Sequence, residues 1–162
     1  MERPEYGVNP LWKFLSANYS LTEVFDLFAP YKGANVKITE GPYPGKSIQS
    51  SMKLIPGNTN YVGTHFGGSL YSMCDPFFMF LLMQELGENY IVWDKAASID
   101  FVKPGKGTVS AIFYIPDEEI EKIKNEVAIK RKMDKEFFVE VKDESEQIVA
   151  RVRKVLYIRK KK

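Results

Sequence analysis

The segment from Ser69 to Leu86 constrains the fold of this chain more than any other. Its side chains are apolar almost all round the helical wheel, and a helix without a polar face has to be covered by protein on every side. Its longest unbroken apolar run, Phe77 to Met83, has seven residues, far fewer than the ~20 that a membrane span requires. The sequence therefore predicts a buried helix at the centre of the molecule, ending near Gly87.

The segments on both sides of this helix have the pattern of strands. Apolar residues alternate with polar ones and are bounded by Pro/Gly turns, which is typical of half-buried strands. An antiparallel sheet can cover such a helix with its inner face while its outer face stays partly polar. We therefore predict an α+β fold in which about five to six strands wrap around a long central helix. The predicted strands are 35–40, 48–54, 91–103, 109–115, 137–141 and 148–158.

A helical extension is predicted before the sheet. Apolar spacing over residues 10–28 indicates one or two amphipathic helices, and Ser20 with Glu23 has the pattern of a capping box. The length of 162 residues fits one domain. We divide the chain into an N-terminal helical extension, residues 1–33, and a single globular unit, residues 34–162.

Composition excludes several classes of protein. The net charge is 23 − 21 = +2, which argues against a nucleic-acid binder that relies on bulk charge. One cysteine and one histidine exclude Cys-rich zinc or iron–sulfur sites and sites with two His ligands, so no metal is expected. The N-terminus lacks the apolar core of a signal peptide. We expect a cytoplasmic protein with neither a membrane nor a nucleic acid as partner.

Two glycines, Gly67 and Gly68, directly precede the predicted helix. Glycine lets a ligand approach the backbone, and the N–H groups at a helix start carry partial positive charge. Such groups can hold a carbonyl oxygen as it becomes an oxyanion. A tight turn from loop to helix is the structural alternative for the same two residues.

Asp75 is the only charged residue between Lys53 and Glu85. A carboxylate in apolar surroundings is costly unless it is paired or used in function. Asp75 followed by Pro76 also suits a helix N-cap with proline at the first helical position. Two interpretations therefore stay open: a cap of a helix that begins there, or a functional carboxylate one to two turns inside a helix that starts near Gly67.

The stretch from Asn60 to Asp75, NYVGTHFGGSLYSMCD, resembles the signature of the hotdog-fold acyl-CoA thioesterases of the phenylacetate-pathway type. In that family an Asn precedes His-Gly-Gly, and an Asp follows the second Gly by seven residues. Here Asn60 stands seven residues before Gly67, and Asp75 seven after Gly68. Together with VWDKAASIDFVKPGKG, the stretch is similar to an uncharacterised bacterial branch of that superfamily, of the DUF4442 type. One departure is that Phe66 replaces the family's His, which is shifted to His65.

The resemblance implies a hotdog fold whose subunits join their sheets edge to edge as a homodimer or tetramer. Asp75 would act as general base or nucleophile on an acyl-CoA thioester. The Gly68 amide of the other subunit would polarise the carbonyl, and Asn60 would position water or hold the loop. No cofactor is implied, because coenzyme A is part of the substrate.

Further residues are candidates for substrate binding. The loop residues would contact the thioester, the helix residues would line a tunnel for the acyl chain, and the lysines would bind the CoA phosphates. The alternatives are a loop histidine bonded to the backbone, plain core aromatics and solvated surface charge. The candidates are His65, Phe66, Gly67, Phe77, Phe78, Met79, Lys103 and Lys106.

A non-catalytic function is the main alternative. A binder of acyl-CoA or lipid would keep the same fold, pocket and dimer but would not turn its ligand over. The shifted His65 favours this alternative, because a displaced histidine need not contact a thioester.

Overall fold

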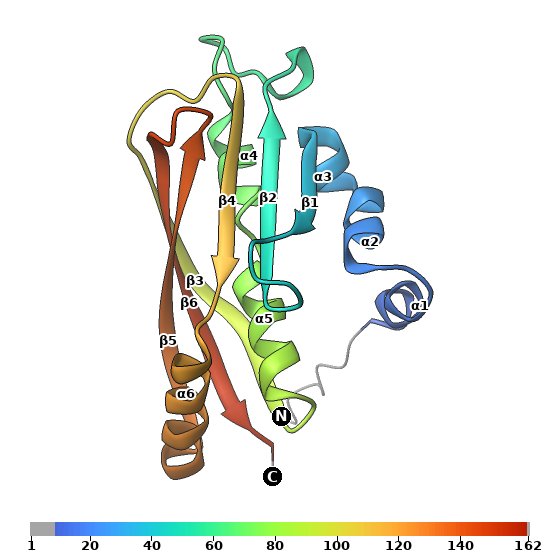
Figure 1. Cartoon of the computed structure of the whole chain (residues 1–162), viewed down its shortest axis with the longest axis vertical. Coiled ribbons are helices and arrows are strands. Elements are labelled where there is room, and N and C mark those ends of the chain that lie inside the picture. The colour runs from blue at the N-terminus through green and yellow to red at the C-terminus, as the bar shows by residue number, and fades with distance from the viewer. Residues whose placement is uncertain (1–8, 162) are drawn as a thin grey trace, which may run out of the picture.

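The computed structural model describes residues 9–161; the first eight residues, which belong to the predicted extension, and Lys162 lie outside them. A six-stranded antiparallel sheet forms the body of the molecule, with the strand order β1-β2-β4-β5-β6-β3 (Figure 1). All six segments with alternating apolar residues form strands, which confirms that prediction. The strands are β1 (Val36–Glu40), β2 (Ser47–Lys53), β3 (Tyr90–Phe101), β4 (Thr108–Tyr114), β5 (Lys132–Asp143) and β6 (Ile148–Lys160).

Two helices, α4 (Gly67–Ser72) and α5 (Phe77–Leu86), lie against the inner face of the sheet. Helix α5 contacts both β3 and β4, which are not neighbours in the sheet, so the sheet curls around it. Met73, Phe77 and Leu82 are completely buried. The predicted hotdog arrangement, a sheet wrapped around a central apolar helix, is confirmed.

The central helix is interrupted at Asp75 and Pro76. Proline lacks an N–H group and disfavours the helical conformation in the residue before it, so the chain leaves the helix after Ser72 and re-enters it at Phe77. The N-cap of α5 is Pro76, and no side chain caps that helix. The interpretation of Asp75 as a helix cap is therefore wrong, and so is its placement inside an unbroken helix.

Within the described residues, three helices precede the sheet, one more than the pattern indicated. They are α1 (Pro10–Asn18), α2 (Leu21–Leu27) and α3 (Ala29–Ala34). The predicted capping box is present at α2, where the Ser20 amide donates to the Glu23 carboxylate (2.8 Å). Proline at position 30 lies in the first turn of α3, a position that suits it. Phe25 and Tyr31 are buried and their rings pack against Phe77, so α2 and α3 share the core of the sheet. The division at residues 33 and 34 stays a prediction.

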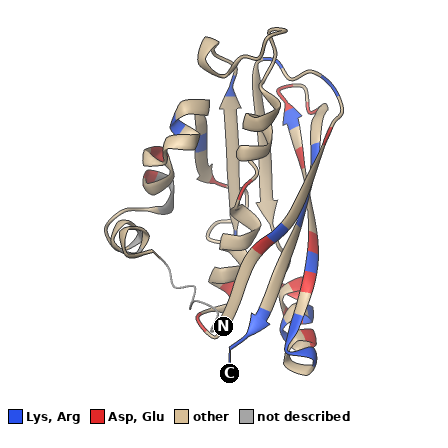
Figure 2. Ribbon diagram, turned by 180° about the vertical axis from the view of Figure 1, so that it is seen from behind, with Lys and Arg blue, Asp and Glu red and all other residues tan. Residues whose placement is uncertain are grey.

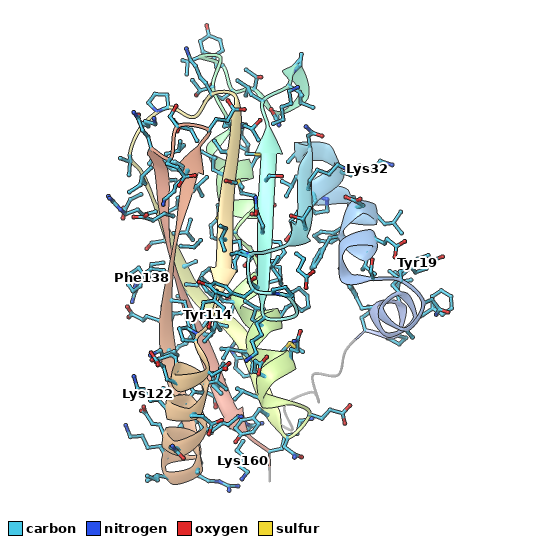
Figure 3. The ribbon with its side chains drawn as sticks, viewed as in Figure 1. Tyr19, Lys32, Tyr114, Lys122, Phe138 and Lys160 are labelled. Atoms are coloured by element: carbon cyan, nitrogen blue, oxygen red, sulfur yellow. The ribbon has the colours of Figure 1, made fainter. Side chains whose placement is uncertain are left out.

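Helix α6 (Asp117–Lys130) connects β4 to β5 and packs against α5, β5 and β6. Ile120, Ile123 and Val127 form its buried face. Charged residues gather on α6, β5 and β6, whereas β4, α4 and α5 carry few (Figure 2). Lys122 of α6 and Phe138 of β5 project away from the body (Figure 3). Within residues 9–161, no helix is long and apolar enough to cross a bilayer.

Candidate functional site

Asp75 lies in the turn between α4 and α5. Its carboxylate accepts a hydrogen bond from Lys154 Nζ, and its backbone carbonyl accepts one from the Tyr31 hydroxyl. The side chain nevertheless keeps 39% of its surface exposed. Asp75 is therefore paired, as a carboxylate in apolar surroundings must be, and it still reaches the solvent.

Lys154 is the buried partner that the sequence analysis missed. It is only 1% exposed and belongs to the inward-facing row of β6, where its neighbours in the row, Val152 and Leu156, are apolar. Its Nζ also lies 3.1 Å from the Tyr71 hydroxyl. Burial would lower the pKa of Lys154, but the hydrogen bonds to Asp75 and Tyr71 and the nearby carboxylates raise it above its ordinary value. The ammonium group is therefore charged at neutral pH.

Asp94 of β3 brings a second carboxylate to Lys154. Its Oδ1 lies 3.1 Å from Nζ, and burial raises the pKa of Asp94 in spite of the opposing charge of Lys154. The β3–β6 register shifts between Asp94 and Ala96, which marks a β-bulge. A bulge changes which side chains of a strand face inward, and Val92 before it and Ile99 after it both pack against the core.

Tyr71, Asp75, Asp94 and Lys154 together form what we call the Asp75 cluster. It joins α4, the helix break, β3 and β6 around one buried ammonium group. Two carboxylates and one ammonium meet in it, and only the Asp75 side of the cluster is substantially open to solvent. A carboxylate held in this way can accept a proton from water or attack an electrophile.

The side chain of Asn60 is engaged within its own loop. Its Oδ1 accepts from the amides of Val62 (3.1 Å) and Thr64 (3.0 Å). Its Nδ2 donates to Thr64 Oγ1 (2.8 Å) and to the His65 carbonyl (3.2 Å). Of the two roles predicted for Asn60, these bonds correspond to holding the loop.

His65 is 2% exposed and anchored to the turn that follows β3. Its ring Nε2 lies 3.1 Å from the Gly107 carbonyl, and its amide donates to the Gly105 carbonyl (3.0 Å). Burial lowers the pKa of His65, and the bond to Gly107 opposes this in part. These contacts match the alternative of a loop histidine that bonds to backbone groups.

The first turn of α4 is covered by aromatic rings. A Cβ at Gly68 would come within 2.5 Å of the Phe66 ring, and one at Gly67 within 2.8 Å of the Phe101 ring. Both rings remain more than half exposed, at 56% for Phe66 and 58% for Phe101. The two glycines thus permit close aromatic packing, while their amides occupy the first turn, where a helix leaves N–H groups unpaired.

The helix residues predicted to line an acyl chain differ in accessibility. Phe77 and Phe78 are buried, at 0% and 3% exposed, and both pack against Phe113. Met79 is partly buried beside the core. Plain core packing therefore describes the two phenylalanines, and Met79 has the more accessible side chain.

The two candidate phosphate-binding lysines also differ. Lys103 Nζ lies 2.5 Å from Asp143 Oδ2 and 2.5 Å from Gln147 Oε1, so its charge is already balanced within the protein. Lys106 is exposed at the tip of the β3–β4 connection. Of the two, Lys106 is better placed to meet an anion from solution.

A family model described as a domain of unknown function, DUF4442, matches residues 19–158. The chain belongs to the DUF4442 family. The match takes in α2, α3 and the sheet except for the last two residues of β6. No curated protein matches this DUF4442 chain at a significant level.

Solved structures share the fold of this DUF4442 chain. A Pseudomonas aeruginosa protein of unknown function, provisionally named a thioesterase, superposes with a TM-score of 0.74 at 17% identity, over 86% of this chain and 93% of its own. A Haemophilus influenzae thioesterase gives 0.63 at 12% identity, over 86% and 88% of the two chains. The PaaI protein of the E. coli phenylacetic acid degradation operon gives 0.56 at 18% identity, over 90% and 91%. At these identities the similarity establishes the hotdog fold.

Proposed function

We propose that this DUF4442 protein hydrolyses acyl-CoA or related thioesters, with Asp75 as general base or nucleophile. The observation that carries the proposal is the Asp75 carboxylate, which is held by a buried lysine at the helix break and is 39% exposed. The hotdog fold, shared with proteins named as thioesterases, supports the same assignment.

Two routes are open to Asp75 in this reaction. As a base it would take a proton from water while the water oxygen attacks the thioester carbonyl carbon, and the C–S bond would then break to release the CoA thiolate. As a nucleophile its carboxylate oxygen would attack the thioester carbonyl carbon and the C–S bond would break, which releases the CoA thiolate and leaves an anhydride between Asp75 and the acyl group; water then hydrolyses the anhydride and regenerates Asp75. In both routes the Gly68 amide would stabilise the negative charge that develops on the carbonyl oxygen.

The edge strand β3 supports a homodimeric site. It is 12 residues long and lies at one edge of the sheet, and its residues 95–98 are exposed. The unpaired backbone groups of an edge strand are a template for pairing with another chain. Pairing of β3 with a second copy would place Asp94, and with it the Asp75 cluster, beside the interface. A homodimer, or a tetramer built from two of them, would let the Gly68 amide of one subunit serve the Asp75 of the other.

The test is hydrolysis of a panel of acyl-CoAs with thiol detection. We expect Asp75→Asn to lower kcat about 100-fold or more, as the loss of a general base commonly does. Asp117→Asn is the matched control. Asp117, the first residue of α6, is an exposed carboxylate paired with Lys46, and this variant should keep the wild-type kcat. Thiol release that is equal in wild type and Asp75→Asn, or absent from the wild type, would contradict the proposal.

The position of Phe66 favours a second candidate, a non-catalytic binder of acyl-CoA or lipid. The Phe66 ring packs directly against Gly68, beside the amide that is proposed to receive the carbonyl oxygen. Calorimetric titration with a non-hydrolysable acyl-CoA analogue separates the candidates when it is combined with the thiol assay. Tight binding without thiol release by the wild type would favour the binder.

A further inference from the structure

We propose that Lys154 is a positioning residue that fixes the Asp75 carboxylate for its reaction with a thioester. This inference rests on the proposed function. It concerns a residue that lies 79 positions from Asp75 in the sequence and is joined to it by the fold.

The position of Lys154 in β6 leaves its ammonium group few choices. The side chain is 1% exposed, and its neighbours in the inward-facing row, Val152 and Leu156, are fully buried. Nζ therefore lies beneath the helix break and cannot reach bulk solvent. A buried cation is tolerated when carboxylates and hydrogen-bond acceptors surround it, and the Asp75 cluster provides them.

Within the Asp75 cluster, Lys154 Nζ donates hydrogen bonds to the Asp75 carboxylate and to the Tyr71 hydroxyl. Asp94 Oδ1 lies 3.1 Å from Nζ, but it has no hydrogen-bond partner of acceptable geometry among residues 9–161. The Tyr71 hydroxyl, 3.1 Å away, holds Nζ from the side of α4. Residues of β6, α4 and β3 thus fix the position of Lys154 Nζ, and the hydrogen bond from Nζ fixes the position of the Asp75 carboxylate.

The backbone of Asp75 is fixed independently of its side chain. The Tyr31 hydroxyl donates to the Asp75 carbonyl from α3, so the main chain is tied at the point where the helix breaks. With the backbone and one carboxylate oxygen both held, the reacting group has little freedom to rotate. Positioning of this kind lowers the entropic part of a reaction barrier.

A purely structural role makes a different prediction from a positioning role. Since Lys154 is buried, it cannot touch substrate, and its loss should leave KM nearly unchanged. If Lys154 positions Asp75, its loss should lower kcat, and it should do so only while Asp75 is present. If Lys154 serves folding alone, the folded fraction of the variant should keep the kcat of the wild type.

The experiment compares kcat and KM for wild type, Asp75→Asn, Lys154→Met and the double variant, each checked for a cooperative thermal transition. We expect Lys154→Met to lower kcat about 10- to 100-fold, because misplacement of a reacting group by about 1 Å can cost 100-fold, with KM changed less than about 3-fold. The double variant should be no slower than Asp75→Asn alone, because the two residues act as one unit.

One control variant separates positioning from general perturbation. Lys135→Met removes a partly buried lysine paired with Glu119, away from the cluster, and should keep the wild-type kcat. If Lys154→Met does not fold, Lys154→Gln takes its place, because its amide is uncharged and its side chain is one bond shorter, so it does not hold Asp75 as the ammonium group does.

The outcomes distinguish failure of this inference from failure of the proposed function. A wild type that releases no thiol would overturn the proposed function and this inference with it. An active wild type whose kcat is retained in folded Lys154→Met or Lys154→Gln would overturn the inference alone. So would a double variant slower than Asp75→Asn by the full factor seen for Lys154→Met.

Discussion

Two polar regions flank the start of the central helix, and they are held together in different ways. In the loop of residues 58–66, all four hydrogen bonds of the Asn60 side chain reach residues at most five positions away. In the Asp75 cluster, the carboxylate of Asp75 bonds to a lysine 79 positions away. The Asn60 side chain is thus held by its own loop, whereas the cluster exists only when β6 and β3 have docked against the helices.

This difference bears on what the spacing motif means. Asn60, Gly68 and Asp75 belong to one motif in the sequence, but their side chains have separate tasks in the fold. Asn60 spends its whole hydrogen-bonding capacity on the loop, whereas Asp75 keeps part of its surface open to solvent. Local bonds can open without global unfolding, and tertiary ion pairs break when the elements that carry them separate. Stability measurements can therefore tell the two regions apart.

The largest expected effect on stability is the loss of the cation in the Asp75 cluster. Lys154→Met should lower the free energy of unfolding by about 3 kcal/mol, because it leaves the Asp75 and Asp94 carboxylates without the buried cation that balances their charge. Lys135→Met, whose lysine is 28% exposed and paired with Glu119, should cost less than about 1 kcal/mol. Urea denaturation of both variants measures this contrast. Equal, small costs would mean that Lys154 does not hold the cluster together.

A smaller and more local effect is expected from the loop. Asn60→Ala removes four side-chain hydrogen bonds and should cost about 1–2 kcal/mol, since part of that capacity is recovered by water. In this variant the amides of Val62 and Thr64 lose their acceptor, Asn60 Oδ1, and should exchange with solvent faster than amides of β6. Asn60→Asp keeps both acceptor bonds and should lose less. A loss of kcat as large as that of Asp75→Asn, with these amides still protected, would show that Asn60 takes part in the chemistry.

Most of the fold could be predicted from periodicity, and the reason is physical. A sheet with one buried face imposes alternation on its strands, and a helix covered on all sides must be apolar all round. Both signals are local, so the strands and the central helix could be identified. The sequence also indicated the interruption at Pro76, because proline restricts the backbone conformation of its own residue and of the residue before it.

The ion pairing of Asp75 could not be predicted in the same way, because a contact between residues 79 positions apart leaves no local pattern. One signal was present in β6, where Lys154 occupies the inward phase between Val152 and Leu156. A second signal lay in β3. Val92 and Ile99 both face the core although they are an odd number of positions apart, which an alternating strand allows only if it contains a bulge. A charged residue at one of the core-facing positions of a strand is thus a reason to look for its partner on the helix that covers the strand.

The smallest expected effect, and the sharpest separation of the two regions, comes from His65. Burial lowers the pKa of His65 below its ordinary value of 6.5, so the unfolded chain takes up a proton before the folded protein does. The stability that neutral His65 contributes is present above pH 6.5 and is lost as the pH falls from there toward the lowered pKa. His65→Gln, which can still donate to the Gly107 carbonyl, lacks this dependence.

Urea denaturation at several pH values between 7.5 and 5 measures the effect as the difference between the pH dependence of wild type and that of His65→Gln. The chain has a single histidine, so the difference belongs to that residue. The same difference should persist in the Asp75→Asn background, because no hydrogen bond in the described chain joins His65 to the Asp75 cluster. An NMR titration that places the pKa of the folded His65 ring at or above 6.5 would contradict its burial. A pH dependence that disappears with Asp75→Asn would instead show that the loop and the cluster titrate as one network.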